Sequence, residues 1–594
     1  MKMTSLQDGT YLALMGLAEE FRTMNPPNMR NCVKCLTAIF QLNPMPVVEL
    51  QVRFHLGTIL TTFAGSLDQA QDHLEKAFYI IVQRQVEDTS DMKFHIANNL
   101  ADIYAKKDQR TRATSVLQQA VDLSRNNTFW HCRFLFKLVQ LYTIDKQYMT
   151  AVNLLTVGAD YAQKVGVLHT RILFLLSQAM LLMLDKKLQE VHQVLNNAGP
   201  LIEAWQGTLQ QKEALKIFFL VLQVCYYLSA GQVKSVKPLL KQLQQGIQTI
   251  TQMPGDGEAA TADQSFQWLP KEHMCVLVYL VTVLHSMQAG YMDKALKYTD
   301  KALLQIEKLK LVEANPILHS FQILLLEHLA MCRLVMGKKC HAVQEINQAV
   351  QICRQERSLA ISHAPQMHCL LGLYAMSMNC MEAAEAQFNA VLRENGTSSD
   401  LRIMASLNLA IVYLRSRKEQ ELNDLLIQLN PESIQTNSHS LRAAAYYVHG
   451  LNAFFQARYN DAKRHLRETL KMANAEDLNR LTSCSLVLLG HIFYSMGNSK
   501  ESLNMVTPAM QLAGKIPDVH VQLWASALLK DLYRLVNQPS QEQEHVTTHA
   551  SFSNQLLQDH FRASQLSEHT LIQWIHGEPP VIQVAVAATA SGIP

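Results

Sequence analysis

Small residues recur at fixed distances along this chain, each set among bulkier apolar residues. In the stretch LADIYAKKDQRTRATSVLQQA, Ala113 and Ala120 follow Ala101 by twelve and nineteen residues. The apolar residues around them recur every three or four positions, as on one face of a helix. The polar run KKDQR interrupts that spacing, so the pattern predicts two short helices joined by a tight turn.

The same offsets recur along most of the chain. Clear copies are centred on Val139, Gly372, Gly450 and Gly490, and weaker copies on Gly57, Ala179, Val224, Val283, Ala330 and Ala410. The spacing resembles the tetratricopeptide (TPR) pattern, in which a small residue on each helix lets the two helices pack closely. It predicts an all-α fold, a right-handed superhelical solenoid of eleven TPR-like helix–turn–helix repeats.

Segments that depart from the repeat divide the chain. The predicted parts are N-terminal capping helices at 1–50, a repeat array at 51–535 with a polar loop insertion at about 252–268, a C-terminal helical segment at 536–577 and a disordered tail at 578–594. The sequence around 537–548 suggests a looser final helix. Prolines fall within two predicted second helices, so we expect a late helix start at Pro238 and a kink at Pro508.

Composition and charge narrow the class of protein. Of 594 residues, 48% are apolar and 17% charged, which is typical of a folded chain with much buried surface. The net charge of +3 gives no reason to expect binding driven by phosphate neutralisation. The eleven cysteines are scattered, which favours a reducing compartment. The strongest apolar run, Met274–Leu284, is shorter than the roughly 20 residues of a membrane helix, so it predicts a buried helix.

Motifs of catalysis are missing from the sequence. It has no phosphate-binding loop, zinc-protease motif or nucleophile elbow, so we predict no catalytic or cofactor-binding residues and no enzyme. Cys32 and Cys35 form a lone C-x-x-C pair without the second pair that zinc requires, and we interpret them as core residues rather than metal ligands. Lysines share a helix face at Lys234, Lys237 and Lys241, and again at Lys294, Lys297 and Lys301. We interpret these faces as solvated, with binding of acidic or phosphate groups as the alternative.

The fifth and ninth positions of each first helix are expected to line the concave side of the array. In register these are Asn98, Asp102, Phe136 and Gln140 in the earlier repeats, and Leu176, Met180, Leu280, Leu284, Met331, Leu373, Leu407, Ile411, Tyr447 and Leu451 in the later ones. The later positions are nearly all apolar, and so long an exposed apolar stripe needs to be covered. We predict that an extended segment of a partner covers it, its main chain bound by side chains such as Asn98 and Gln140. The alternative is a tight superhelix that closes on itself and buries these residues as core.

Long blocks of the sequence resemble one family. VKSVKPLLKQLQQGIQTI, FQWLPKEHMCVLVYLVTVLHSMQAGYMDKALKYTDKAL and PAMQLAGKIPDVHVQLWASALLKDLY are similar to the TPR subunit of the cohesin loader, in the "maternal affect uncoordinated" family of chromatid cohesion factors. The resemblance extends from about Tyr11 to Trp574. It implies a non-enzymatic scaffold that wraps the extended N-terminal segment of a large HEAT-repeat loader subunit and reaches cohesin and chromatin indirectly. It also implies a nuclear location and a role in sister-chromatid cohesion and chromosome segregation, without a membrane or small-molecule partner.

A generic TPR adaptor or co-chaperone that binds peptide segments of other partners remains the alternative function. Such adaptors usually grip a peptide end in a polar, basic groove. The apolar stripe predicted here counts against that interpretation.

Overall fold

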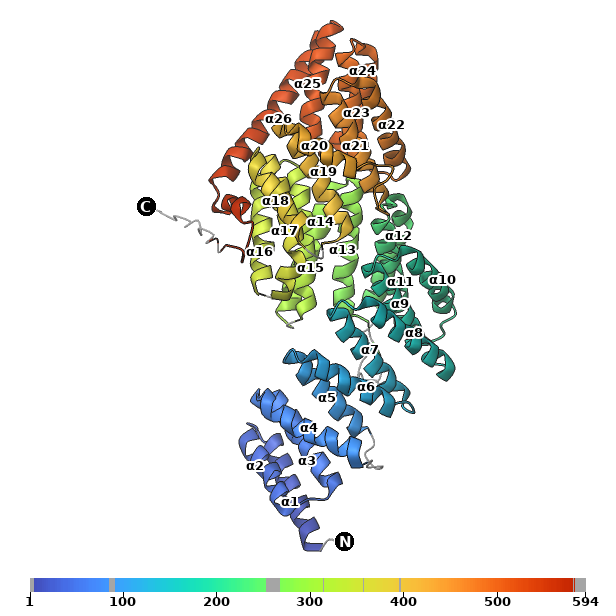
Figure 1. The fold of residues 1–594 in the computed structure, drawn as a ribbon, viewed down its shortest axis with the longest axis vertical. Helices are drawn as coiled ribbons and strands as arrows, with labels where there is room; N and C mark the ends of the chain where they lie inside the picture. Colours follow the sequence, from blue (N-terminus) through green and yellow to red (C-terminus); the bar gives the residue numbers. More distant parts are fainter. Residues whose placement is uncertain are drawn as a thin grey trace, which may run out of the picture. The chain divides into compact units, whose positions relative to one another are not determined.

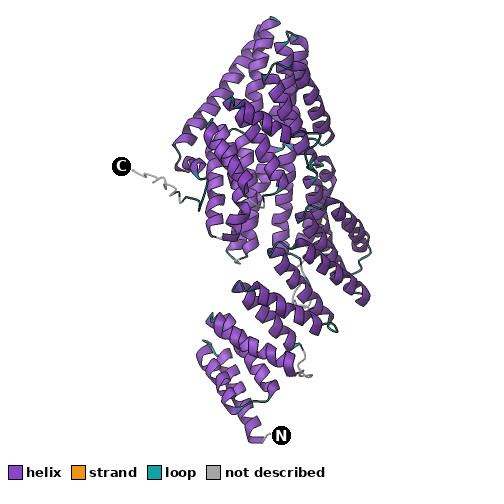
Figure 2. Ribbon diagram, in the orientation of Figure 1, coloured by secondary structure: helices purple, strands orange, loops and turns teal. Residues whose placement is uncertain are grey.

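The computed structural model describes residues 5–84, 91–252, 266, 268–312, 315–355, 357–394, 397–580 and 582. Within these ranges the regular structure is helical and contains no strand (Figure 2). The predicted all-α fold is therefore confirmed. Almost all of the predicted polar loop and of the predicted tail lies outside the described residues.

Consecutive helices form pairs joined by short turns (Figure 1). The pairs are α1 (Ser5–Thr23) with α2 (Met29–Ile39), α3 (Pro46–Ile59) with α4 (Leu67–Arg84), α5 (Met92–Lys106) with α6 (Arg110–Leu123), α7 (Thr128–Ile144) with α8 (Tyr148–Val165), α9 (Leu168–Leu184) with α10 (Leu188–Glu203), α11 (Leu209–Ser229) with α12 (Val233–Gln252), α13 (Lys271–Ala289) with α14 (Met292–Lys310), α15 (Pro316–Val335) with α16 (Lys339–Gln355), α17 (Arg357–Ser377) with α18 (Met381–Arg393), α19 (Ser399–Ser416) with α20 (Glu419–Gln428), α21 (His439–Phe455) with α22 (Tyr459–Ala475), α23 (Asn479–Ser495) with α24 (Ser499–Lys515), and α25 (Val519–Leu535) with α26 (Pro539–Gln565). Short helical segments are η1 (Phe40–Leu42), the π-helical η2 (Leu60–Ala64) and η3 (Ser567–Gln573).

A residue in the left-handed conformation ends the first helix of each repeat. Asp108, with φ of 58°, lies seven residues after Ala101, which holds the small position of its repeat. The next amide, of Gln109, donates to the carbonyl of Tyr104 at 2.8 Å, as in a common helix C-cap. The same seven-residue spacing leads from the small positions of later repeats to Lys146, Lys186, Gly231, Gly290, Gly337, Asn379, Arg417, Ala457 and Gly497. The backbone thus confirms the repeat register.

The first repeat differs by one residue. Its left-handed residue, Gly65, follows the small position Gly57 by eight residues. The π-helical segment η2 lies between them, and a π-turn holds one residue more than an α-turn. The insertion therefore leaves the helix pair intact.

The chain divides into two compact units. Unit 1 comprises Met1–Thr208 with Glu258–Phe266, and unit 2 comprises Leu209–Gly257 with Gln267–Pro594. In unit 1, α4 to α7 share an apolar core that includes the fully buried Ala113 and Phe134. In unit 2, each first helix also packs against the first helix of the next repeat, from α11 and α13 through to α23 and α25.

Unit 2 closes on itself. The amide of His439, at the start of α21, donates to the carbonyl of Ala230 at 3.0 Å, in the turn after α11. The side-chain amide of Asn479 donates to the carbonyl of Ala289 at 2.8 Å, across 190 positions of sequence. We call these contacts between early turns and late repeats the seam. The seam therefore supports part of the alternative prediction, a superhelix that closes on itself.

Two glycines allow close contacts between early turns and late repeats. Gly231 and Gly337 have φ of 71° and 73°, a conformation that disfavours other residues. A Cβ on Gly231 would lie 2.8 Å from the amide nitrogen of Ser440, and one on Gly337 would lie 2.6 Å from the side chain of Leu556. Other repeats hold Asp, Lys or Ala at this backbone angle, so the close approach to the Ser440 backbone is what excludes a side chain at Gly231.

The C-terminal helical segment is part of unit 2. α26 packs on α25 and α16, and η3 packs on α16, α17 and α18 (Figure 1). Gln387 is fully buried and donates to the carbonyls of Ile572 at 2.9 Å and Trp574 at 2.7 Å. α25 and α26 form a twelfth repeat whose end is bound to earlier helices. Residues 537–548 are mostly exposed, and the looser packing expected there stays a prediction.

Both prolines singled out in the sequence lie inside helices. The predicted late start at Pro238 is wrong, because α12 begins at Val233. Val233 and Val236 are fully buried and fix the first turn in the core. The helix therefore tolerates the loss of the one backbone hydrogen bond that proline cannot donate. α24 runs through Pro508 from Ser499 to Lys515.

Two strongly apolar helices, α13 and α15, are core helices of unit 2. The run Met274–Leu284 lies within α13 and is largely buried, as predicted. α15 is long and apolar enough to cross a membrane by length and composition, but more than half of its apolar stretch is buried inside the molecule. It packs against α13, α14, α16 and α17, which accounts for its composition.

Candidate partner-binding groove

Three residues predicted to line the groove are core residues. Leu280 and Leu407, at fifth positions in unit 2, are each 4% exposed, and Leu176 in unit 1 is fully buried. In unit 2 neighbouring first helices pack directly on one another, so the side chains of Leu280 and Leu407 fill the space between them. The expectation that these three residues are accessible is therefore wrong.

The ninth positions of unit 2 remain half-buried. We define the apolar stripe as Leu284, Met331, Leu373, Ile411 and Leu451 with Tyr447, from five successive first helices. One side of each residue packs on a core cluster and the other side is accessible. An extended segment lying on the stripe would remove this apolar surface from water.

Charged groups beside the stripe are paired. Glu327, at the fifth position of α15, is 3% exposed and lies 2.7 Å from His363. Arg480 Nε donates to Asp518 Oδ2 at 2.7 Å; burial lowers the pKa of this guanidinium, but the Asp518 charge and hydrogen bond outweigh burial, so the pKa is raised overall. Burial raises the pKa of the Tyr447 hydroxyl. Arg480 and Asp518 neutralise each other, unlike the charges of a clamp that grips a charged peptide end.

The concave positions of unit 1 are more polar. Lys137 Nζ donates to Asp102 Oδ1 at 2.6 Å, which links α7 to α5, and Asn98 Nδ2 donates to Asp102 Oδ2 at 3.3 Å. Burial lowers the pKa of Lys137, although Asp102 opposes the shift. Asn98 is 7% exposed, and its Oδ1 accepts no hydrogen bond from the described residues. Asp102 and Gln140 are exposed, but Asn98 is buried, so the expectation that Asn98 is accessible to a partner's main chain is wrong.

Aromatic rings form a second feature of unit 1. Phe136 is half-buried and stacks on Phe174, with centroids 4.2 Å apart and planes 9° apart. Together with the half-buried Phe129, about two helical turns earlier on α7, they form what we call the aromatic platform. The register of fifth and ninth positions predicted Phe136 but missed Phe129 and Phe174, which lie at other positions. Met180, from α9, is 37% exposed.

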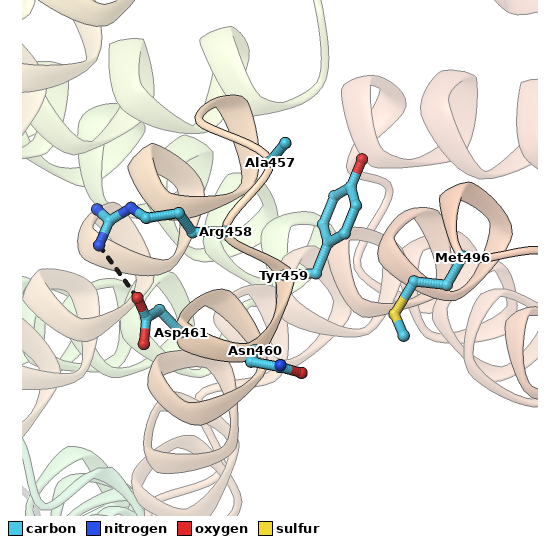
Figure 3. A pocket seen from close by; sticks show the side chains of 6 residues that line it. All are labelled: Ala457, Arg458, Tyr459, Asn460, Asp461 and Met496. Carbon is cyan, nitrogen blue, oxygen red and sulfur yellow. Dashed lines mark hydrogen bonds and ion pairs between the residues drawn. The ribbon is translucent and has the colours of Figure 1, made fainter.

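A pocket of about 300 Å³ lies at the turn between α21 and α22. It is lined by Ala457, Arg458, Tyr459, Asn460, Asp461 and Met496 (Figure 3). Arg458 and Asp461 form an ion pair at 3.1 Å, so each neutralises the other. The lining residues include no serine, cysteine, histidine or lysine.

The cysteine pair lies in the N-terminal core, and one of the lysines lies at the seam. Cys32 is buried and Cys35 half-buried in the N-terminal core, and burial raises the pKa of the Cys32 thiol. Within the described ranges, no three His, Cys, Asp or Glu residues gather as a metal site would require. Lys237 forms a 2.5 Å ion pair with Asp477, so this lysine belongs to the seam rather than to a purely solvated face.

The sequence is similar to proteins of one known family along nearly its whole length. The family model described as "Cohesin loading factor" matches residues 10–540. The MAU2 chromatid cohesion factor homolog of Aedes aegypti is 52% identical over 98% of this chain and 94% of its own length. The homolog of Drosophila willistoni is 50% identical over 97% of this chain and 88% of its own length.

A solved structure shares the fold. Scc4, crystallised in complex with Scc2n, aligns with 94% of this chain and 100% of its own, with a TM-score of 0.59 and 12% identity. A second structure, of Scc4 with Scc2n and Ctf19n, gives a TM-score of 0.58. From the family match and the near full-length identity to its curated relatives, this chain belongs to the cohesin loading factor family.

Proposed function

We propose that this chain is a scaffold subunit of a cohesin loading complex. Its solenoid binds the extended N-terminal segment of the large HEAT-repeat loader subunit. Through that subunit it supports the loading of cohesin onto chromatin, sister-chromatid cohesion and chromosome segregation in the nucleus. It acts by binding rather than by catalysis.

The apolar stripe carries this proposal. Its half-buried side chains come from successive first helices and lie along one inferred path. Burying one such side chain is worth about 1.5–3 kcal/mol, and each is already partly buried, so a segment that covers several gains only part of that for each. Membership of the cohesin loading factor family and the crystallisation of Scc4 with Scc2n support the same kind of partner.

Affinity purification from nuclear extract tests the proposal. The tagged full-length chain should recover one large partner in stoichiometric amount, and co-expression with the N-terminal fragment of that partner should raise the yield of soluble chain. Recovery of many unrelated clients at low occupancy would instead support a generic TPR adaptor. Recovery of no loader subunit would contradict the proposed function.

A further inference from the structure

Phe266 lies on the aromatic platform of unit 1. It follows α12 in sequence, far from the other residues of unit 1, with which it groups. Its ring stacks on Phe129 with centroids 5.3 Å apart and planes 26° apart. It also contacts Phe136, with centroids 5.4 Å apart. Phe266 itself is only half-buried.

The platform is rigid beneath Phe266. Phe174 is fully buried below Phe136, and its ring fills the space that a side chain at position 158 would occupy. A Cβ on Gly158 would lie 2.5 Å from that ring. Because close packing fixes Phe174, Phe136 has a fixed surface to stack on. A ring that docks on this platform meets a surface that is already formed, which lowers the cost of binding.

Polar groups next to the platform bond to one another. Lys137 follows Phe136 directly and donates to Asp102, which also accepts from Asn98. Asn98 Oδ1 is closed to solvent, so a partner's amide does not reach it. The platform itself, on which the phenyl ring of Phe266 already lies, indicates the class of occupant, an aromatic side chain.

We propose that the platform is a subsite for an aromatic side chain of the partner's extended segment, and that Phe266 is an internal occupant which the partner displaces. The identity of the partner rests on the function proposed above. Phe266 fits the role because it offers the same chemistry, a phenyl ring on a chain segment, without being buried. The platform is then unoccupied in only a fraction of the molecules. The apparent affinity for the partner is reduced by that fraction.

Replacing Phe266 tests the proposal. The probe is the N-terminal fragment of the large loader subunit of the same species, titrated calorimetrically into the full-length chain. Phe266→Ala should bind the fragment about three- to tenfold more tightly than the parent, since two ring contacts no longer compete. Phe136→Ala should bind at least tenfold more weakly. The matched control is Phe561→Ala, because Phe561 is an exposed phenylalanine in α26, and it should leave the affinity unchanged.

Each other outcome has a defined meaning. Unchanged or weaker binding by Phe266→Ala, with the parent binding normally, overturns the internal-occupant proposal and makes Phe266 a structural residue. Unchanged binding by Phe136→Ala overturns the subsite. Failure of the parent to bind the fragment overturns the proposed function and, with it, the partner assigned to the platform.

Hydrogen exchange provides a readout that does not depend on a variant. When the fragment binds the parent chain, amides around Phe266 should exchange faster, while those of Phe129–Phe136 stay protected. Slower exchange around Phe266 would show that it remains seated, and would overturn displacement. If Phe266→Ala fails to fold, Phe266→Leu keeps apolar bulk without the ring, and the same gain in affinity is expected.

Discussion

At the scale of single residues, the small side chains set how closely helices pack. Ala113 on α6 is fully buried in the core that α4 to α7 share. Ala113→Leu should overpack this contact and lower the free energy of unfolding by roughly 1–3 kcal/mol, measured by denaturant titration. The matched control is Ala105→Leu, because Ala105 is exposed on α5. Equal stability of Ala113→Leu and the parent would contradict the register.

A buried carboxyl should make stability depend on pH. Glu345 on α16 accepts a hydrogen bond from Arg333 Nε at 3.1 Å, but burial, with a smaller contribution from Asp300, raises its pKa to about 7. The folded chain therefore binds a proton that the unfolded chain releases, and stability is lost as pH rises from about 4.5 to about 7.

Glu345→Gln should remove this loss. The variant keeps an oxygen for Arg333 without the buried charge. Its stability relative to the parent should increase across that pH interval, by on the order of 3 kcal/mol at most. Chemical denaturation of both proteins at several pH values measures the difference. A difference that does not vary with pH would contradict the raised pKa.

At the scale of helices, the apolar stripe separates binding from folding. Leu284 and Ile411 are half-buried ninth-position residues on α13 and α19. Changing both to Asp should weaken binding of the loader fragment about a hundredfold or more, because two apolar contacts are lost and two charges are desolvated. Calorimetric titration measures the affinity, and thermal unfolding measures the fold.

Two results would change this account of the stripe. Full affinity in the Leu284→Asp, Ile411→Asp variant would show that the stripe is not the binding surface. Unfolding of the chain would show that the stripe is internal core, as in a superhelix closed throughout. Ala113→Leu serves as the contrast, since it should impair folding before binding.

At the scale of the whole molecule, the seam turns a linear array into a closed unit. In an open solenoid each repeat contacts only its neighbours, but the seam joins repeats that lie far apart in unit 2. Damage at the seam should therefore lower the stability of many repeats together.

A pair of glycines tests the seam directly. Gly231 and Gly497 have similar backbone angles, with φ of 71° and 79°, but only Gly231 faces a late repeat, and a Cβ on Gly497 would meet nothing within 4 Å. Both alanine variants carry the backbone strain of about 1 kcal/mol. Gly231→Ala should lose more stability, because it also collides with the Ser440 amide. Equal losses in thermal unfolding would show that the seam contributes little.

Much of the fold follows from local sequence patterns. The small position, the apolar spacing and the turn seven residues later are all local, so Ala101 and Asp108 could be matched without knowledge of distant residues. The all-α class and the repeat register were predictable for that reason. The family was predictable because long blocks of sequence resemble it.

Tertiary structure decided which predicted groove residues are accessible. Leu280 and Leu284 lie one helical turn apart and are both leucine, yet one is core and the other is half-buried. Leu280 is a member of the core cluster formed with α14 and α15, while Leu284 packs against that cluster with one side only. The seam and the seating of Phe266 join residues far apart in sequence, and no local spacing encodes such contacts. The sequence by itself determined the repeat, while the packing of repeats on one another decided which of its surfaces a partner can reach.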